Sequence, residues 1–435
     1  MATISEMHAE AAGGGMGTKN ERLVVVGTGC AGVELAFAAR AAGWSGSITL
    51  IGDEAVLPYH RPPLSKAYLV GEASADSLLL RTPALFEKSD IELLTSAKAT
   101  SIDRGRMHLC LSDGRNLPYD RLILATGGRP RPLSAAAGGA EFATNFRYLR
   151  TLADADAIRG NLVAGHRLVV VGGGYVGLEV AAAAIKLGMR VTVLEAASRI
   201  LARVTAAPLS AFYETVHRQA GVEVRTGEQV EGFELSADRR KVTAVRCASG
   251  ARMDADLVVA GIGLIPNCNL AIDAGLQVDD GIVVDSQMCT ADEAIMAAGD
   301  CTKFHSDLYG RMVRIESVPN ALEQARKIAA LICGKSPRKD SAPWFWSDQY
   351  DLNLKMVGLS HGYDNLVFRG TPDSRNFSAF YMLKERVLAV DTINRPVEFN
   401  LSKQLISERS SVSLAQLADD AVPLKSILES STRID

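Results

Sequence analysis

The chain has 435 residues, of which 47% are hydrophobic and 22% are charged, and its formal net charge is -3. This length predicts two or three domains, because single domains usually hold roughly 100 to 200 residues. The small negative charge argues against a nucleic-acid binder that neutralises phosphates, and no apolar run is long enough for a membrane helix, so we expect a soluble protein.

Two further features concern the location of the protein. Residues 1–20 contain no apolar stretch or basic leader of the signal-peptide type, and we expect them to form a disordered tail. The seven cysteines include no C-x-x-C pair and no even framework. This pattern favours reduced thiols in a cytoplasm over a disulfide scaffold, and it predicts no metal site.

The first informative segment is an apolar strand over 23–26 that runs into a glycine-rich turn. A helix is predicted from there to residue 42, and a second strand over 48–51. The small residues make the turn tight, let the backbone approach a pyrophosphate and pack the helix on the strand. Asp53 follows at the distance expected for a ribose-binding acid. The residues of this first fingerprint are Gly27, Gly29, Ala31 and Gly32.

A second copy of the same plan begins with the strand 168–171. It continues through a glycine-rich turn and a helix to the strand 191–194, which ends at Glu195. The likeness extends to the segments 120–127 and 256–263. A repeated fingerprint predicts two dinucleotide folds and therefore two bound dinucleotides. The glycines of this second fingerprint are Gly172, Gly174 and Gly177.

Glu195 indicates which nicotinamide nucleotide binds the second fold. A carboxylate at this place accepts hydrogen bonds from both ribose hydroxyls and repels a 2'-phosphate, so NADH is favoured over NADPH. Two alternatives remain open. In the first, Glu195 is only a solvated loop acid. In the second, the nearby Arg199 accommodates NADPH.

The last part of the chain has no nucleotide fingerprint. Strands are predicted over 354–359, 365–369, 379–383 and 387–391, with helices around Lys403 and Leu414. This order predicts a mixed α+β domain over 343–435.

Together these motifs resemble the FAD- and NADH-dependent ferredoxin reductases of bacterial oxygenase systems, over nearly all of the chain from Glu21 onward. The stretches that carry the resemblance are RPPLSK at 61–66, ATGGRP at 125–130, GGGY at 172–175, AAGDC at 297–301, ESVPNA at 316–321 and WFWSDQY at 344–350. The resemblance implies an α/β fold with two Rossmann-like domains of the glutathione-reductase-like type. An FAD-binding domain would comprise 21–128 and 262–342, and an NADH-binding domain 129–261, before the C-terminal domain.

The resemblance also assigns site residues. On the FAD side they are the first fingerprint with Asp53, Lys66, Arg150, Asp300 and Val318, and on the NADH side the second fingerprint with Tyr175 and Glu195. Lys66 is expected near the flavin N5 edge with Glu179 as its partner, the alternative being a surface ion pair. Tyr175 is either a gate between nicotinamide and flavin or helix packing, and Trp346 either covers the flavin or packs in a core.

The segment 61–66 contains no cysteine, whereas the related disulfide reductases carry a cysteine pair beside the flavin. Electrons are therefore expected to leave singly, to a [2Fe-2S] ferredoxin that feeds a cytochrome P-450 or another oxygenase. The candidates for docking this acidic partner are Arg326, Lys355, Lys403 and Lys425. Two other functions stay open, an NADH oxidase or peroxide reductase of the same fold and a non-catalytic flavoprotein that senses NADH.

Overall fold

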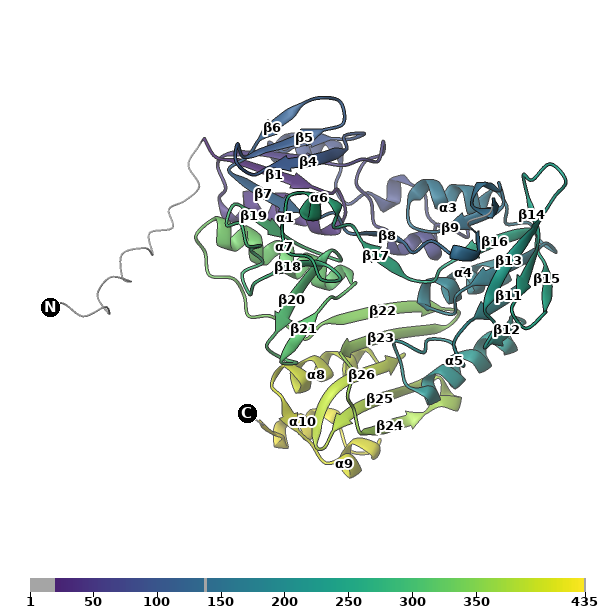
Figure 1. Cartoon of the computed structure of the whole chain (residues 1–435). Helices are drawn as coiled ribbons and strands as arrows, with labels where there is room; N and C mark the ends of the chain where they lie inside the picture. The colour runs from purple at the N-terminus through teal and green to yellow at the C-terminus, as the bar shows by residue number, and fades with distance from the viewer. Residues whose placement is uncertain (1–19, 137–138, 434–435) are drawn as a thin grey trace. The chain divides into compact units, whose positions relative to one another are not determined.

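The computed structural model describes residues 20–136 and 139–433, and the predicted tail therefore lies outside the described residues except for Asn20. The chain forms two compact units. Figure 1 labels their helices and strands. Unit 1 contains the residues up to 60, 79–128 and 266–340, and unit 2 contains 61–78, 129–265 and 341–435. Within the described part of the chain, no helix has both the length and the apolar character needed to cross a membrane.

Unit 1 is built on a five-stranded parallel sheet in the order β19-β7-β1-β2-β3. Strands β1 and β7 are almost wholly buried apolar runs, as expected for parallel strands covered on both faces. Helices α1 (Cys30–Ala42) and α7 (Val318–Ile332) pack against each other. The strands are β1 (Arg22–Val26), β2 (Ser47–Ile51), β3 (Glu92–Leu94), β7 (Arg121–Leu124) and β19 (Ile295–Ala297).

Smaller elements complete unit 1. An antiparallel sheet contains β4 (Ala99–Asp103), β5 (His108–Leu111) and β6 (Asn116–Pro118), and a second small sheet contains β18 (Ile282–Val284), β20 (Thr302–Ser306) and β21 (Arg311–Val313). The short helices are α2 (Pro83–Lys88) and α6 (Asn269–Asp273). The chain passes between the units in the short strands β8 (Gly128–Pro130) and β17 (Leu264–Pro266).

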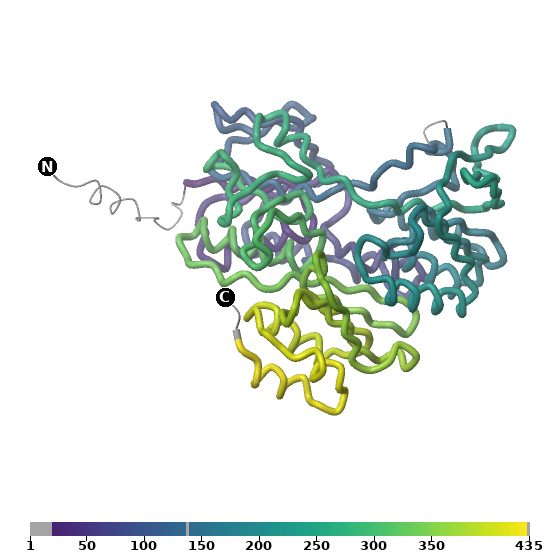
Figure 2. Tube along the Cα trace, turned by 60° about the horizontal axis from the view of Figure 1, so that its bottom comes forward, coloured from purple at the N-terminus to yellow at the C-terminus, as the bar shows by residue number. Residues whose placement is uncertain are grey.

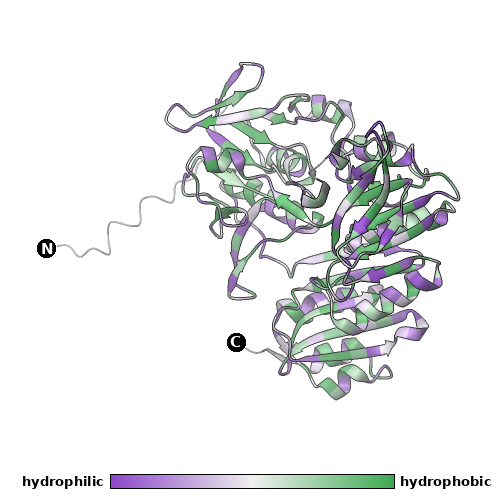
Figure 3. Cartoon of the chain, turned by 45° about the vertical axis from the view of Figure 1, so that its right-hand side comes forward, coloured by the Kyte–Doolittle hydropathy of each residue, from purple (hydrophilic) through white to green (hydrophobic). Residues whose placement is uncertain are grey.

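Unit 2 contains a second five-stranded parallel sheet, in the order β12-β11-β10-β16-β9. Figure 3 shows apolar residues along the strands of the chain. The strands are β9 (Phe146–Tyr148), β10 (Arg167–Val171), β11 (Arg190–Glu195), β12 (Glu223–Thr226) and β16 (Leu257–Ala260), and the helices are α3 (Leu152–Arg159), α4 (Tyr175–Lys186) and α5 (Ala207–Gln219). A three-stranded antiparallel sheet adds β13 (Val230–Leu235), β14 (Val242–Cys247) and β15 (Arg252–Asp254).

The predicted internal repeat is confirmed strand by strand. β7 lies beside β1 as β16 lies beside β10. In each pair of strands, an aspartate just before the second strand binds the first arginine of the first strand. Asp120 accepts hydrogen bonds from the backbone N and Nε of Arg22 at 2.7 and 2.8 Å, and Asp256 accepts those of Arg167 at 2.8 and 3.0 Å. The two sheets differ in their fifth strand, because β9 precedes the second fingerprint whereas β19 comes late in the chain.

The C-terminal part of unit 2, the yellow-green segment of Figure 2, has the mixed α and β elements that were predicted for it. Its antiparallel sheet has the order β22-β23-β26-β25-β24. The strands are β22 (Trp344–Gln349), β23 (Leu352–Gly358), β24 (Asn365–Thr371), β25 (Asn376–Leu383) and β26 (Arg386–Ile393), extended by β27 (Ser410–Ser411) and β28 (Thr432–Arg433). The helices are α8 (Pro396–Ser407), α9 (Leu414–Ala418) and α10 (Leu424–Ser430).

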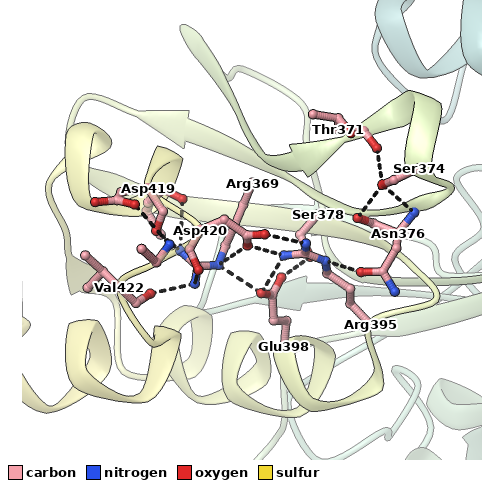
Figure 4. A network of polar contacts seen from close by, with 12 residues as sticks. Arg369, Thr371, Ser374, Asn376, Ser378, Arg395, Glu398, Asp419, Asp420 and Val422 are labelled. Carbon is pink, nitrogen blue, oxygen red and sulfur yellow. Dashed lines mark hydrogen bonds and ion pairs between the residues drawn. The ribbon is translucent and has the colours of Figure 1, made fainter.

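A buried ionic network holds these helices on the sheet (Figure 4). Arg369 of β24 is only 3% exposed, and its Nε donates to Glu398 of α8 at 2.8 Å. The same guanidinium donates to the carbonyl oxygens of Asp419 and Val422, at 2.6 and 2.5 Å. It thereby satisfies backbone acceptors of the segment between α9 and α10.

Candidate functional site

The first fingerprint of unit 1 forms an open cradle in front of helix α1. Gly29 is the N-cap of α1, and no atom lies within 4 Å of the place where its side chain would begin. A Cβ at Gly27 would lie 2.1 Å from the carbonyl oxygen of Ala125, and one at Gly32 would lie 1.9 Å from that of Gly27. Gly27 and Gly32 are thus needed for close packing, whereas Gly29 keeps free space where helix N–H groups can meet a pyrophosphate.

The segment around Asp300 lies beside this cradle. A Cβ at Gly299 would lie 3.3 Å from the Cβ of Ala31, so the Gly299–Asp300 turn adjoins the first turn of α1. Gln324 of α7 fixes that turn, because its Oε1 accepts the N–H of Gly299 at 2.7 Å and the hydroxyl of Thr302 at 3.1 Å. The Gln324 side chain is buried, and its Nε2 has no hydrogen-bond partner among the described residues. Sequence reasoning missed Gln324, since a glutamine inside a helix carries no motif.

Asp53 and Val318 complete the residues expected on this side. Val318 is the first residue of α7. Asp53 is exposed and follows Gly52, which directly succeeds β2. The strand registers pair Val26 with Ile51 and Val171 with Leu194, so Gly52 occupies the place that Glu195 has in the second sheet. The two acids are therefore not equivalent, and Asp53 lies one residue further along.

The second fingerprint, in unit 2, repeats the geometry of the first. Gly174 is the N-cap of α4, and a Cβ added to it would likewise meet no atom within 4 Å. A Cβ at Gly172 would lie 2.4 Å from the carbonyl oxygen of Gly261, and one at Gly177 would lie 2.2 Å from that of Gly172. The same division holds, with two glycines needed for packing and one that leaves open space at the N-terminus of α4.

Glu195 lies at the edge of this second cradle. Its Oε2 accepts the N–H of Gly173 at 2.8 Å, and its Oε1 accepts that of Ala197 at 2.8 Å. The interpretation of Glu195 as a solvated loop acid is therefore wrong. A carboxylate has about four acceptor sites, so two backbone bonds leave capacity for ribose hydroxyls.

Arg199 has a structural task in the loop after β11. Its guanidinium donates to the carbonyl oxygens of Thr205 and Ala202, at 2.8 and 2.9 Å, and to Ser210 Oγ at 2.5 Å. These bonds hold the loop on the start of α5. The guanidinium is thus occupied, which weighs against a site for a 2'-phosphate.

Lys66 and Glu179 form the predicted pair. Lys66 Nζ lies 2.8 Å from Glu179 Oε2, and the two side chains are 19% and 3% exposed, so the alternative of a surface ion pair is wrong. The hydroxyls of Ser65 and Ser347 also donate to this carboxylate, at 2.5 and 2.6 Å. The carboxylate is therefore fixed by η1 (Pro62–Ser65), α4 and β22. No motif pointed to the two serines as partners of Glu179, because they lie far apart in the chain.

Two aromatic candidates lie near β22. Tyr175 is 9% exposed, and its hydroxyl donates to Met356 Sδ at 3.0 Å while its ring lies 5.3 Å from that of Phe345. Burial raises the pKa of Tyr175 well above its usual value. Trp346 is half-buried, with its ring 5.7 Å from that of Trp344. The structure thus places Tyr175 in a packed position, and the gate and flavin-covering roles stay predictions.

Arg150 begins the segment that leads into α3. Its carbonyl oxygen accepts Arg61 Nη1 at 2.7 Å, and its backbone N–H donates to Asp154 at 3.0 Å. Asp154 also forms a capping box with Thr151 at the start of the helix. Arg150 is therefore held close to the segment that contains Lys66.

The four basic candidates differ in their surroundings. Arg326 lies 2.6 Å from Glu34, and Lys425 lies 3.7 Å from Glu429. Lys403 Nζ instead lies 4.4 Å from the ring centre of Trp344 and 4.2 Å from that of Phe399, and Lys355 Nζ lies 5.3 Å from the latter. We call Trp344, Lys355, Phe399 and Lys403 the aromatic–lysine patch.

All seven cysteines are free thiols, and none lies in the segment 61–66. Among the described residues, no group of histidines, cysteines and acids is arranged to hold a metal ion.

Comparison with known proteins matches residues 21–325 to the pyridine nucleotide-disulphide oxidoreductase family and residues 344–428 to the reductase C-terminal family. The chain is 63% identical to putidaredoxin reductase CamA of Pseudomonas putida, over 94% of this chain and 97% of that protein. It is 41% identical to rhodocoxin reductase of Rhodococcus erythropolis, over 93% of each. The crystal structure of a covalent putidaredoxin reductase–putidaredoxin complex matches with a TM-score of 0.93 and 62% identity, covering 95% of this chain and 99% of that one. The chain therefore belongs to the pyridine nucleotide-disulphide oxidoreductase family and ends in a reductase C-terminal domain.

Proposed function

We propose that this protein is an FAD-containing, NADH-dependent ferredoxin reductase that passes electrons one at a time to a [2Fe-2S] ferredoxin, which in turn feeds a cytochrome P-450 or another oxygenase. The observation that carries the proposal is the pair of glycine cradles at α1 and α4, in a chain similar to putidaredoxin reductase over almost its full length. A cytoplasmic location with reduced thiols is part of the same proposal.

The residues of unit 1 suit the adenine dinucleotide part of FAD. Gly29 leaves the N-terminus of α1 open for the pyrophosphate. Asp300 lies beside the same turn, where its carboxylate can accept hydrogen bonds from the hydroxyl groups of the ribityl chain. Asp53, Val318, Lys66 and Arg150 are assigned to FAD as well, on the strength of the family resemblance. When bound, FAD supplies the chemistry that takes up a hydride and releases single electrons.

The residues of unit 2 suit NADH. Gly174 opens the N-terminus of α4 to the pyrophosphate, and Glu195 presents its remaining acceptor sites to the ribose hydroxyls. Tyr175 would have to leave its contacts with Phe345 and Met356 in order to act as a gate. The occupied guanidinium of Arg199 supports NADH over NADPH.

Lys66 and Glu179 are proposed to set the electrostatics at the flavin. The buried carboxylate orients the ammonium group, and the ammonium group is a fixed positive charge in a place of low dielectric, where it stabilises negative charge strongly. Neither side chain needs to exchange a proton for this role.

The aromatic–lysine patch is proposed to be part of the ferredoxin-docking surface. Its two lysines are held on aromatic rings, so less side-chain entropy is lost when they meet acidic groups. Trp346, next to Trp344 on β22, is the candidate to lie between flavin and ferredoxin. Arg326 and Lys425 remain candidates with carboxylates already beside them.

Stopped-flow mixing of the FAD-loaded protein with NADH or NADPH, followed by a putidaredoxin-type ferredoxin, tests the proposal. We expect rapid flavin reduction by NADH, slower reduction by NADPH, and then bleaching of the iron–sulfur absorbance. Rapid reduction that is followed by fast consumption of oxygen, without transfer to ferredoxin, would favour the oxidase. Reduction without turnover of either acceptor would favour the NADH sensor.

A further inference from the structure

A chain of hydrogen bonds leads from Glu179 to the surface of unit 2. Ser347 Oγ lies 2.6 Å from Glu179 Oε1, and Gln349 Nε2 lies 3.1 Å from Ser347 Oγ. Beyond them, His217 Nε2 lies 2.8 Å from Gln349 Oε1, and Tyr350 Oη lies 3.0 Å from His217 Nδ1. Four successive contacts therefore connect a buried carboxylate with a tyrosine that is 39% exposed.

The elements explain how these residues come together. Ser347 and Gln349 are two residues apart on β22, so both side chains point to the same face of the strand. His217 lies near the end of α5 and is fully buried, and the ring of Tyr350 packs edge-on against it at 5.0 Å. Ser347 is 1% exposed and Gln349 is 2% exposed, so water cannot readily replace either partner.

The donors of this chain all point the same way. Glu179 is paired with Lys66 and acts only as an acceptor, so Ser347 must use its single proton for Glu179. Its oxygen is then an acceptor for the amide group of Gln349, which turns Gln349 Oε1 toward His217. His217 must therefore carry its proton on Nε2, and Nδ1 accepts the hydroxyl of Tyr350.

Burial keeps this direction from reversing. The pKa of His217 is lowered to about 4 by burial, so its ring is neutral near pH 7 and has one donor only. Burial also raises the pKa of Tyr350, which keeps its hydroxyl protonated and able to donate. A flip of Gln349 would set its NH2 group against the Nε2–H of His217, and its carbonyl oxygen would draw the Ser347 proton away from Glu179.

We propose that Ser347, Gln349, His217 and Tyr350 form a directed hydrogen-bond chain that positions the Glu179 carboxylate, and through it Lys66, for the reduction of the flavin by NADH. The four are positioning residues, because none of them needs to touch a cofactor. The inference rests on the proposed function, in which Lys66 acts on the flavin. It assigns a role to His217 and Gln349, two buried residues that the nucleotide sites do not use.

The protonation pattern of His217 gives the first test, independent of catalysis. Protein with ¹⁵N-labelled histidine contains seven such residues, and a His217→Gln variant identifies the signals of the one in question. We expect His217 to carry a proton on Nε2 and none on Nδ1 at pH 7. A proton on Nδ1, or a doubly protonated ring, would overturn the directed chain.

The second test uses stopped-flow mixing to compare flavin reduction by NADH in variants of the hydrogen-bond chain. In Ser347→Ala the rate constant of flavin reduction by NADH should fall about tenfold, which corresponds to a loss of about 1.4 kcal/mol, with an unchanged Kd for NADH. Ser347→Thr keeps the hydroxyl and should recover most of the rate. Tyr350→Phe, at the surface end, should slow the reaction less than Ser347→Ala and loosen the preference of His217 for one tautomer.

Tyr363→Phe is the matched control. Tyr363 is also 39% exposed and belongs to the same domain, but it is not part of the hydrogen-bond chain. It should change neither the rate nor the spectrum of His217. If Ser347→Ala reduces its flavin as fast as the unaltered protein, the inference fails although the proposed function stands. If the unaltered protein reduces its flavin with NADH but does not reduce ferredoxin, the proposed function fails instead.

Discussion

Lys66 Nζ lies 2.8 Å from Oε2 of Glu179, on a carboxylate that is only 3% exposed and that two serine hydroxyls also contact. Removal of the cation would leave a buried charge without its counterion, whereas removal of both charges would not. This asymmetry leads to a first prediction about stability.

Lys66→Met should lower the free energy of unfolding by about 3 kcal/mol, because Glu179 keeps only neutral donors. The double variant Lys66→Met/Glu179→Gln should recover more than half of this loss, although its flavin should still be reduced slowly. Urea denaturation measures both changes. Lys186→Met, which breaks the exposed pair with Glu72, is the control and should cost less than about 1 kcal/mol. Equal losses in Lys66→Met and Lys186→Met would contradict the buried pair.

The second prediction concerns the choice between NADH and NADPH. Glu195→Ser should reduce the preference for NADH about tenfold, because the repulsion of a 2'-phosphate disappears. It should not produce a preference for NADPH, since Arg199 is bound to Thr205, Ala202 and Ser210 and does not supply a cation. The ratio of kcat/KM for the two nucleotides is the measurement. A variant that prefers NADPH would show that Arg199 leaves its loop.

The sequence predicted the repeated nucleotide folds well, since each strand, glycine turn and helix is local in the chain. The Lys66–Glu179 pair was also predicted, although only through the family resemblance. Ser347, Gln349 and His217 were not predicted, because their roles depend on β22 and α5 meeting in space. The occupied state of Arg199 was not predicted either, because its partners lie in an irregular loop and at the start of α5, where no sequence motif fixes the side-chain geometry. The domain boundaries and the assigned cofactor contacts remain predictions.

A third prediction follows from the network in the C-terminal domain. Arg369→Met should destabilise the protein by about 3 kcal/mol, because two backbone carbonyl oxygens lose their buried donor and Glu398 keeps only Arg395 and Ser378 as partners. Hydrogen exchange should rise most in α9 and α10. Arg375→Met, which removes a half-buried arginine paired with the exposed Asp351, should change both quantities little. Unaltered exchange in α9 and α10 after Arg369→Met would contradict the role of the network.

Asp391 gives a prediction about pH. Its side chain is buried and accepts the hydroxyls of Tyr381 and Thr205, at 2.6 and 2.8 Å, and burial raises its pKa to about 6. In the unfolded chain an aspartate ionises near pH 4, so the folded state binds the proton more tightly. The resulting stabilisation is complete below about pH 4 and is lost as the pH rises through about 6.

Asp391→Asn removes this proton equilibrium and tests it directly. The difference in unfolding free energy between the unaltered protein and the variant should shift in favour of the variant by a few kcal/mol between pH 4 and pH 7, since one unit of pKa difference corresponds to about 1.4 kcal/mol. The comparison of the two proteins matters because His217, whose pKa is lowered, changes stability in the opposite direction over the same range. A difference that stays constant with pH would show that burial does not raise the pKa of Asp391 above its value in the unfolded chain.

The fifth prediction separates glycines that the fold needs from glycines that a ligand needs. A Cβ at Gly29 or Gly174 meets no atom within 4 Å, and both residues have extended backbone angles that alanine adopts readily. A Cβ at Gly32 would instead lie 1.9 Å from the carbonyl oxygen of Gly27. Gly29→Ala should therefore fold with a loss below about 1 kcal/mol, as for an N-cap change, while Gly32→Ala should lose about 3 kcal/mol.

The alanine variants at the two N-caps should also bind their dinucleotides more weakly, because an added methyl group at either N-cap keeps a pyrophosphate away from the helix N–H groups. Gly29→Ala should bind FAD at least tenfold more weakly, which corresponds to about 1.4 kcal/mol, and Gly174→Ala should keep FAD but bind NADH more weakly by a similar factor. Flavin fluorescence on dilution and titration with NADH measure the two affinities. Each alanine variant serves as the control for the other, since the two N-caps are alike in geometry. If Gly29→Ala holds FAD as tightly as the unaltered protein, the pyrophosphate does not lie at α1, and the assignment of the first cradle to FAD is wrong.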